Sequence, residues 1–170
     1  MAQSLNGATK VNPRYYSGPK PATVNAIPTD AVTYKAGQPG YYDSNGKAEA
    51  FADDGANLEF FFANTRDSAL TATSDKVHTI DPDTKFMVAV VDGTTDTAAS
   101  RTMVGALYSL EVISNVAVLD LDSGGAHSND IFKVDGLMSD VEPKRHAIAD
   151  VPGHVYGHII RTASSDVDAS

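Results

Sequence analysis

The stretch from Met103 to Asp122, MVGALYSLEVISNVAVLDLD, constrains the fold most, because it has the pattern of two strands joined by a tight turn. In its first half, polar and apolar residues alternate with a period of two, which is typical of a half-buried strand. Ser114-Asn115 supplies a two-residue turn, since asparagine tolerates positive φ. The second half is apolar on both faces, and Gly124-Gly125 ends it. The stretch therefore predicts a β-hairpin at the centre of a β-domain.

Short strand-like runs flank this hairpin on both sides, with turn signals between them. They cover residues 31–35, 41–42, 47–52, 58–63, 77–80, 85–91, 131–134 and 155–162. Asn45-Gly46 fits a type I′ turn between two of the runs. Gly157, inside the last run, indicates a bulge or a close backbone approach. Many short strands at fairly regular spacing predict a mainly β fold, either a compact β-sandwich or a small β-barrel.

Composition divides the chain into an extended N-terminal arm (1–29), a β-rich body (30–163) and an acidic tail (164–170) that is expected to fray. The arm carries three basic residues, no acidic residue and four prolines, which disfavour helix. It also carries Tyr15 and Tyr16, and aromatic residues of this kind are typical of interfaces. Two interpretations stay open: the arm lies along another surface, or it folds back on its own domain.

Composition also argues against several classes of function. The formal net charge of -9 argues against a nucleic-acid partner, which would be met by a basic patch. The chain has no cysteine, which excludes disulfides and thiolate metal sites. No apolar run reaches the length of a transmembrane helix, and the first residues lack the apolar core of a signal peptide. We therefore expect no membrane partner and no secretion through the general pathway.

Two patterns suggest metal binding, and neither meets its requirement. His154 and His158 are four residues apart, which would suit a helix, but the residues around them favour a strand. In a strand that spacing is about 13 Å, too far for one ion, so we expect a surface or interface role for both histidines. Residues 120–131 resemble the start of a calcium loop, but Ile131 replaces the bidentate acid of the twelfth position. A looser oxygen cage stays open there, from Asp120, Asp122, Asn129 and Asp130.

The sequence contains no catalytic signature. It has no G-x-S-x-G nucleophile elbow and no Gly-rich phosphate loop followed by Lys-Ser or Lys-Thr. We assign no catalytic, cofactor-binding or metal-binding residue and expect a protein that is not an enzyme. Three consecutive phenylalanines imply burial on both faces of a strand or at a subunit contact. The candidate interface residues are these phenylalanines and the paired tyrosines of the arm: Tyr15, Tyr16, Phe60, Phe61 and Phe62.

Four segments carry a resemblance to a known family. KAGQPGYYDSNGKAEAFADDG (35–55) is similar to the first hairpin of small tailed-bacteriophage head proteins, in which an alanine-rich return strand precedes a bulky one. DGTTDTAASRTMVGALYSLEV (92–112), VLDLDSGGAHSNDIFKVDGL (118–137) and VYGHIIRT (155–162) are similar to the second half of the same group. These are the capsid decoration, or cement, proteins, and the likeness is one of layout over residues 31–162. The arm is consistent with it, because cement proteins often reach across capsomers with extended termini.

The resemblance implies a structural role on the outer capsid surface of the virion, for a protein made in the host cytoplasm that binds and reinforces the shell. The implied partners are the major capsid protein and further copies of this chain in a symmetric homo-oligomer, for which we expect a trimer. Closed symmetry would also bury the apolar run LEFFFA (58–63) on every copy. Two other classes stay open: a phage tail or fibre module, and a small carbohydrate-binding or hydrolytic β-domain, for which Tyr41-Tyr42 would offer a stacking surface.

Overall fold

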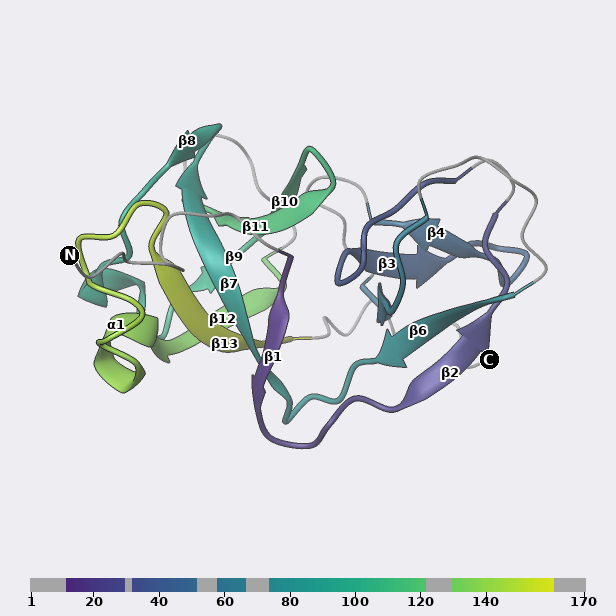
Figure 1. Ribbon diagram of the computed structural model, residues 1–170, viewed down its shortest axis with the longest axis horizontal. Coiled ribbons are helices and arrows are strands. Elements are labelled where there is room, and N and C mark those ends of the chain that lie inside the picture. Colours follow the sequence, from purple (N-terminus) through teal and green to yellow (C-terminus); the bar gives the residue numbers. More distant parts are fainter. Residues whose placement is uncertain (1–11, 30–31, 52–57, 67–73, 122–129, 161–170) are drawn as a thin grey trace.

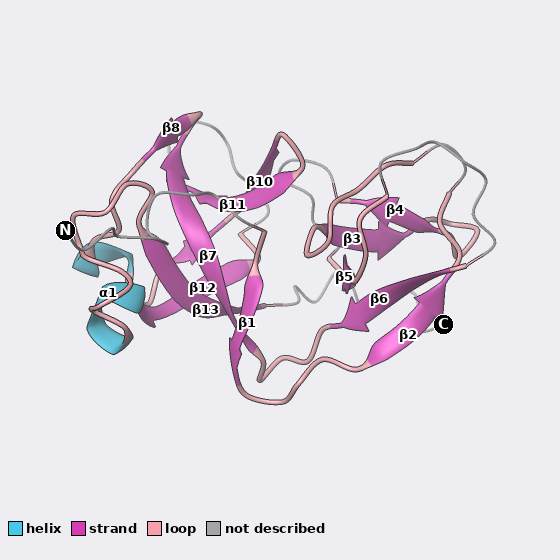
Figure 2. Cartoon of the chain, in the orientation of Figure 1, coloured by secondary structure: helices cyan, strands magenta, loops and turns pink. Residues whose placement is uncertain are grey.

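The fold is mainly β, as the sequence predicts, and its strands form two sheets (Figure 1). A computed structural model describes residues 12–29, 32–51, 58–66, 74–121 and 130–160. We call the eight-stranded sheet the large sheet and the five-stranded one the small sheet. They lie at opposite ends of the long axis of the molecule. Helical structure in the described residues is limited to η1 (Arg101–Met103) and α1 (Met138–Val141), as Figure 2 shows.

The large sheet curls into a half-barrel. Its strands follow the order β10-β11-β7-β13-β12-β9, and β1 and β8 also pair with β7. Neighbouring strands are antiparallel except β11 and β7, which are parallel. Because Ser109 alone separates β9 from β10, the two ends of this path are consecutive in the chain, and the sheet has to curl. The strands are β1 (Arg14–Ser17), β7 (Lys85–Asp92), β8 (Thr95–Asp96), β9 (Leu107–Tyr108), β10 (Leu110–Ile113), β11 (Val116–Asp120), β12 (Phe132–Leu137) and β13 (His154–Ile159).

The small sheet closes on itself. Its order is β2-β6-β5-β3-β4, with antiparallel neighbours. Just after β2 the chain reaches the opposite edge, where the Ala48 N–H donates to the Ile27 carbonyl (2.8 Å) and the Thr29 N–H donates to the Ala48 carbonyl (3.0 Å). The two outer strands therefore meet, and the sheet forms a small barrel. Its strands are β2 (Thr23–Ala26), β3 (Pro39–Tyr42), β4 (Ala48–Ala50), β5 (Phe60–Phe62) and β6 (Asp75–Thr79).

The described part of the predicted arm, residues 12–29, folds back on the body. β1 pairs with β7, and β2 pairs with β6. Between the sheets the two connecting segments lie side by side: Thr84 Oγ1 donates to the Pro19 carbonyl (2.6 Å), and a Cβ at Gly18 would overlap the Asp83 carbonyl oxygen. Of the two interpretations of the arm, the structure therefore shows the one in which it folds back on its own domain, for these residues. Residues 1–11 and the whole predicted tail, 164–170, lie outside the described residues.

β5 contributes side chains to two hydrophobic cores and so joins the two sheets. Phe60 and Phe62 lie in the core of the small barrel, where Phe62 stacks on Tyr34 with 3.7 Å between ring centroids. Phe61 lies in the core of the large sheet, and its ring centroid is 4.7 Å from that of Phe86. All three phenylalanines are at most 3% exposed, so the structure shows burial on both faces of the strand. The oligomeric state stays a prediction. The three phenylalanines leave no exposed apolar surface that an oligomer contact could bury.

The central hairpin has the turn that the sequence predicts. β10 pairs with β11 as far as Ile113 and Val116, the residues on either side of the two turn residues. Ser114 and Asn115 have φ angles of 51° and 65°. Positive φ at both central residues is the requirement of a type I′ turn, whose twist matches that of the strands.

The turn between β3 and β4 differs from the prediction. A type I′ turn would need positive φ at Asn45 as well as at Gly46, and only Gly46 has it, with φ 73°. The Gly46 N–H donates instead to the Asp43 carbonyl (2.9 Å), and the Asp43 carboxylate accepts from the backbone N–H groups of Asn45 and Lys47 (2.8 Å each). The hairpin is present, but the aspartate side chain stabilises a longer loop.

One predicted strand is absent, and another is longer than predicted. The run 31–35 forms no strand in its described part, where Tyr34 makes only an isolated bridge with Arg66. Tyr34 is buried there, and burial together with its hydrogen bond to Asp75 raises the pKa of its hydroxyl. The run predicted at 131–134 continues as β12 to Leu137, because the chain passes through a bulge instead of ending at Asp135-Gly136.

Phe61→Ala is expected to destabilise each subunit, because it removes a buried ring from the contact between the two sheets. Such a change in a core costs about 3–5 kcal/mol, which urea unfolding followed by circular dichroism would measure. Val24→Ala, at an exposed position on β2, is the control and should change the free energy of unfolding by less than about 0.5 kcal/mol. An unchanged free energy of unfolding with loss of an oligomer in light scattering would instead place Phe61 at a subunit contact.

Candidate interaction surface

The outer face of the large sheet carries a cluster of aromatic and charged side chains from β1, β7, β12 and β13. The ring centroids of Tyr16 and Tyr156 are 4.8 Å apart, and Lys85 Nζ lies 5.8 Å from the Tyr156 centroid. His158 is two residues after Tyr156 on β13, so the two side chains share a face. Lys85 pairs with His158 across β7 and β13. We call these residues the tyrosine face: Tyr16, Lys85, Asp135, Tyr156 and His158.

Asp135 is the acceptor in the charged part of the tyrosine face. Its Oδ2 atom lies 2.8 Å from His158 Nδ1 and 3.5 Å from Lys85 Nζ. With Pro82 and Asp83, these residues line a hollow of about 150 Å³. The five lining residues include no serine, threonine or cysteine that could act as a nucleophile. They offer two carboxylates, an imidazole and an ammonium group, which suits hydrogen bonding to a polar group on a partner.

A β-bulge positions this cluster. The pairing of β12 with β13 shifts register between Val134 and Gly136, which leaves Asp135 as the extra residue. A Cβ at Gly136 would overlap the Tyr156 ring, and a Cβ at Gly157 would overlap the carbonyl oxygen of Lys133. The close backbone approach predicted from Gly157 is therefore confirmed. Gly136 has a second role that the sequence did not indicate, because it lets the Tyr156 ring lie against β12.

The predicted interface residues fall in three environments. Tyr16 belongs to the tyrosine face. Tyr15 is 42% exposed, and its hydroxyl donates to the Gly18 carbonyl (2.7 Å). The phenylalanines of β5 are buried inside the chain. The structure therefore separates these residues. The partners of Tyr16 come from three other strands, which no local sequence pattern links to the arm.

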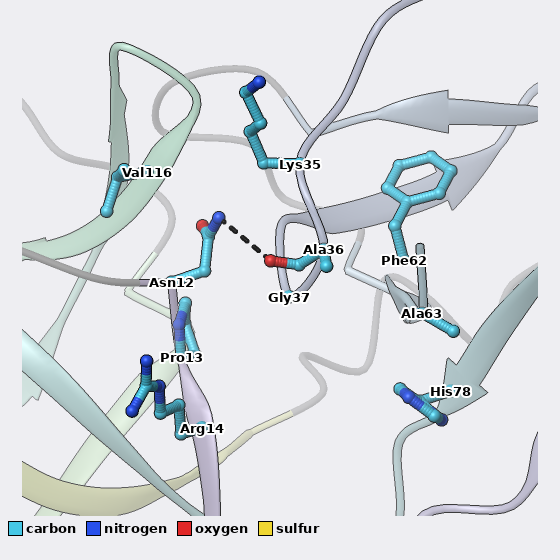
Figure 3. Close-up of a pocket in the computed structure, with 10 residues that line it drawn as sticks. All are labelled: Asn12, Pro13, Arg14, Lys35, Ala36, Gly37, Phe62, Ala63, His78 and Val116. Carbon is cyan, nitrogen blue, oxygen red and sulfur yellow. Dashed lines mark hydrogen bonds between the residues drawn. The ribbon is translucent and has the colours of Figure 1, made fainter. Parts of the chain in front are cut away.

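A second feature is the contact between the arm and both sheets, at Asn12 (Figure 3). Asn12 Nδ2 donates to the carbonyls of Asn115 (3.0 Å) and Ala36 (3.3 Å). Its Oδ1 accepts from the Ala117 N–H (2.8 Å). One buried amide thus joins the β10–β11 hairpin of the large sheet to the loop before β3 of the small sheet. Sequence reasoning missed Asn12, because a single asparagine in a Pro-rich segment gives no signal.

Beside Asn12 a hollow of about 540 Å³ lies between the two sheets. Three basic residues line it, but Figure 3 shows the charged groups of Arg14 and Lys35 directed away from its centre. His78 lies at its edge, 3.0 Å from Thr23 Oγ1 through Nδ1. The remaining wall is formed mainly by backbone and small or apolar side chains: Pro13, Ala36, Gly37, Phe62, Ala63 and Val116. The basic groups therefore do not converge on a common point in this hollow.

Both histidines of the predicted pair lie on β13, which confirms that they belong to a strand. His158 is half-buried at the tyrosine face. His154 is only 3% exposed and packs against His146, so the surface role predicted for it is wrong. Among the residues that the structure describes, no group of three or more His, Cys, Asp or Glu residues could hold a metal ion.

The calcium-like loop falls mostly on residues 122–129, which lie outside the described residues. Of its predicted oxygen donors, two are described: Asp120 is buried at the end of β11, and Asp130 is exposed. Oδ1 of Asp120 accepts the Gly93 N–H (2.9 Å), which ties β11 to the turn after β7.

Comparisons with protein-family models and with curated proteins find no match for this chain. In the described ranges, neither helix has the length and apolar character needed to cross a membrane. The assignment of function therefore depends on the surfaces described above and on the resemblance in the sequence.

Asn12→Ala is expected to lower the free energy of unfolding by about 1–3 kcal/mol, because it leaves the buried Ala117 N–H without its acceptor. Urea unfolding at neutral pH measures the change. Asn25→Ala is the matched control, since Asn25 is an exposed asparagine on β2, and it should be close to neutral. Equal effects of the two substitutions would mean that the contact between arm and sheets contributes nothing to stability.

Proposed function

We propose that this protein is a structural component of a tailed-bacteriophage head, which binds the outer capsid surface and stabilises the shell. In this proposal the coat protein is the main partner, and copies of the chain associate as a symmetric oligomer, most simply a trimer. The tyrosine face is the surface that contacts the coat protein.

The observation that carries the proposal is the pairing of Tyr16 with Tyr156 on the outer face of the large sheet, beside Lys85 and Asp135. Aromatic side chains dominate the energy of many protein interfaces, and a polar surround gives them specificity. The fold holds these side chains on strands, so little conformational entropy is lost when they bind.

The segments that resemble cement proteins supply much of this surface. Asp135 lies in the segment 118–137, and Tyr156 and His158 lie in 155–162. The first of the similar segments forms the β3–β4 hairpin of the small sheet. The acidic composition of the chain, with twenty-two acidic and thirteen basic residues, also favours a basic partner surface.

The tyrosine face favours one other function, binding of a carbohydrate. Sugars stack on aromatic rings and exchange hydrogen bonds with carboxylates, and Tyr156 lies close to the hollow beside Asp135 and His158. Binding of the wild-type protein to a glycan array, with no binding to capsid shells, would favour this alternative.

Tyr16→Ala is expected to weaken binding to capsid shells about 30-fold, which corresponds to about 2 kcal/mol for the loss of an aromatic anchor. Cosedimentation with shells that lack the protein gives the dissociation constant and the ratio to coat protein. Tyr42→Ala, at an exposed tyrosine of the small sheet, is the control and should bind like wild type. Tyr15→Ala tests the neighbouring exposed tyrosine of β1. Wild-type binding by Tyr16→Ala would exclude the tyrosine face, and no binding by wild type would exclude the function.

Decorated heads are expected to retain their DNA to a higher temperature than bare heads. A protein that binds the assembled shell and not its separated subunits stabilises the shell by about 2.7 kcal/mol per independent site at a hundredfold excess over Kd. DNA release on heating, followed with an intercalating dye, measures the difference. Release at the same temperature from both kinds of head would contradict the reinforcing role and favour a display or host-binding role.

A further inference from the structure

The segment between α1 and β13, residues 143–151, is attached to the rest of the molecule mainly through one side chain. It lies at the end of the molecule far from the small sheet (Figure 1). Within it, His146 is the only buried residue. Its backbone hydrogen bonds to described residues are local: Arg145 and His146 donate to the Glu142 carbonyl, and Asp150 donates to that of Ala147. We call residues 143–151 the flap.

The buried side chain of the flap lies on a second histidine. The ring centroids of His146 and His154 are 4.9 Å apart, with 54° between the ring planes. His146 is 4% exposed and His154 is 3% exposed. Nδ1 of His146 is buried without a hydrogen bond, and neither nitrogen of His154 makes one with standard geometry, although the Pro152 backbone lies close enough to raise the pKa of that ring. Burying a charge without a close counter-ion costs far more than burying a neutral ring, and His154 has no described carboxylate in close contact, so this contact is favoured while the rings are uncharged.

The surroundings keep both rings neutral at pH 7. Burial lowers the pKa of His154 to about 4; the His146 imidazole and Arg14 of β1 also lower it, while Asp150 and the Pro152 backbone raise it. Burial likewise lowers the pKa of His146, against the opposing effects of Glu142, 4.0 Å from Nε2, and of Asp150. Arg145 adds a further lowering effect on His146. No carboxylate makes close contact with His154 that would compensate a charge on its ring.

We propose that the His146–His154 contact is an acid-sensitive latch, and that protonation of the pair releases the flap from the outer face of the large sheet. The chain that follows the flap is held independently of it. Gly153 donates to the Thr97 carbonyl (2.7 Å) and accepts from the Val90 N–H (2.9 Å), so β13 stays in place when the flap leaves. His154 and Tyr156 share a face of β13, and release therefore uncovers a histidine next to the tyrosine face.

The direction of the pH effect follows from the lowered pKa values. A histidine with a lower pKa in the closed state than in the open state binds fewer protons when closed, so the closed state is favoured fully above about pH 6.5. Its advantage is lost as the pH falls from 6.5 towards 4, the window set by the ordinary pKa and that of buried His154. The opening equilibrium constant should rise roughly a hundredfold across this window, because each unit of pKa difference is a factor of ten.

A nitroxide label on the flap tests the proposal. The chain has no cysteine, so Ile148→Cys, at an exposed flap residue, gives a single labelling site. Label mobility in electron paramagnetic resonance should rise reversibly between pH 7.5 and 4.5, with its midpoint below 6.5. A label at Val24→Cys on the small sheet is the control and should not change. Histidine ring NMR should show His146 and His154 titrating with the same midpoint.

The variant His146→Phe/His154→Phe distinguishes titration of the two histidines from titration of nearby carboxylates. It keeps two aromatic rings in contact and removes the titrating nitrogens, so the flap should stay closed to pH 4.5. Glu142 and Asp150 remain in this variant, and an equal rise in mobility would assign the opening to them and overturn the proposal. Constant mobility in the wild type, or ring titration at or above pH 6.5, would overturn it too. The NMR titration uses the wild-type chain, so it tests whether the two histidines titrate together below pH 6.5 even where the double variant does not fold.

Discussion

The fold depends on the burial of β5 on both of its faces. Phe60 and Phe62 fill the small barrel, and that leaves Phe61 on the outside, where it contacts Phe86 of the large sheet. Burial of one such side chain is worth about 1.5–3 kcal/mol, so the small barrel is driven to dock. Three more residues near the small sheet enter the same core: Phe51, Leu58 and Ile80. Residues from both sheets therefore build the core of the large sheet, and this brings the small sheet near enough to the arm for Asn12 to contact both.

Sequence reasoning predicted the features that local chemistry determines. The Ser114-Asn115 turn, the close approach at Gly157 and most of the strand runs depend on a few neighbouring residues, and these were found, whereas the run 31–35 forms no strand in its described part. The pairing of strands depends on partners far along the chain. β1 pairs with β7, and the supporting hydrogen bond joins residues 65 apart, Thr84 and Pro19. The parallel pairing of β11 with β7 and the closure of the small barrel are equally non-local. Periodicity predicts that a strand exists, and it does not specify the partner.

The same limit applies to the candidate interaction surface. Paired tyrosines in a Pro-rich arm gave a signal, and Tyr16 does lie in an aromatic cluster. The rest of the tyrosine face depends on a bulge, because an extra residue at Asp135 changes which side chains of β12 meet β13. The phenylalanines gave an equally strong signal in the sequence. Their role is decided by whether another part of the same chain covers them, which the sequence alone left as one of two alternatives.

The outer face of the large sheet connects the two proposals. Along β13, alternate side chains place His154, Tyr156 and His158 on this face, and their environments change steadily from one end to the other. The flap covers His154, the Tyr16 ring packs on Tyr156, and His158 is half-exposed beside Asp135. Because Gly153 is fixed by backbone hydrogen bonds to Thr97 and Val90, the flap can open without moving the tyrosine face. Acid would then enlarge this face by a positively charged ring, which favours an acidic partner group over a basic one.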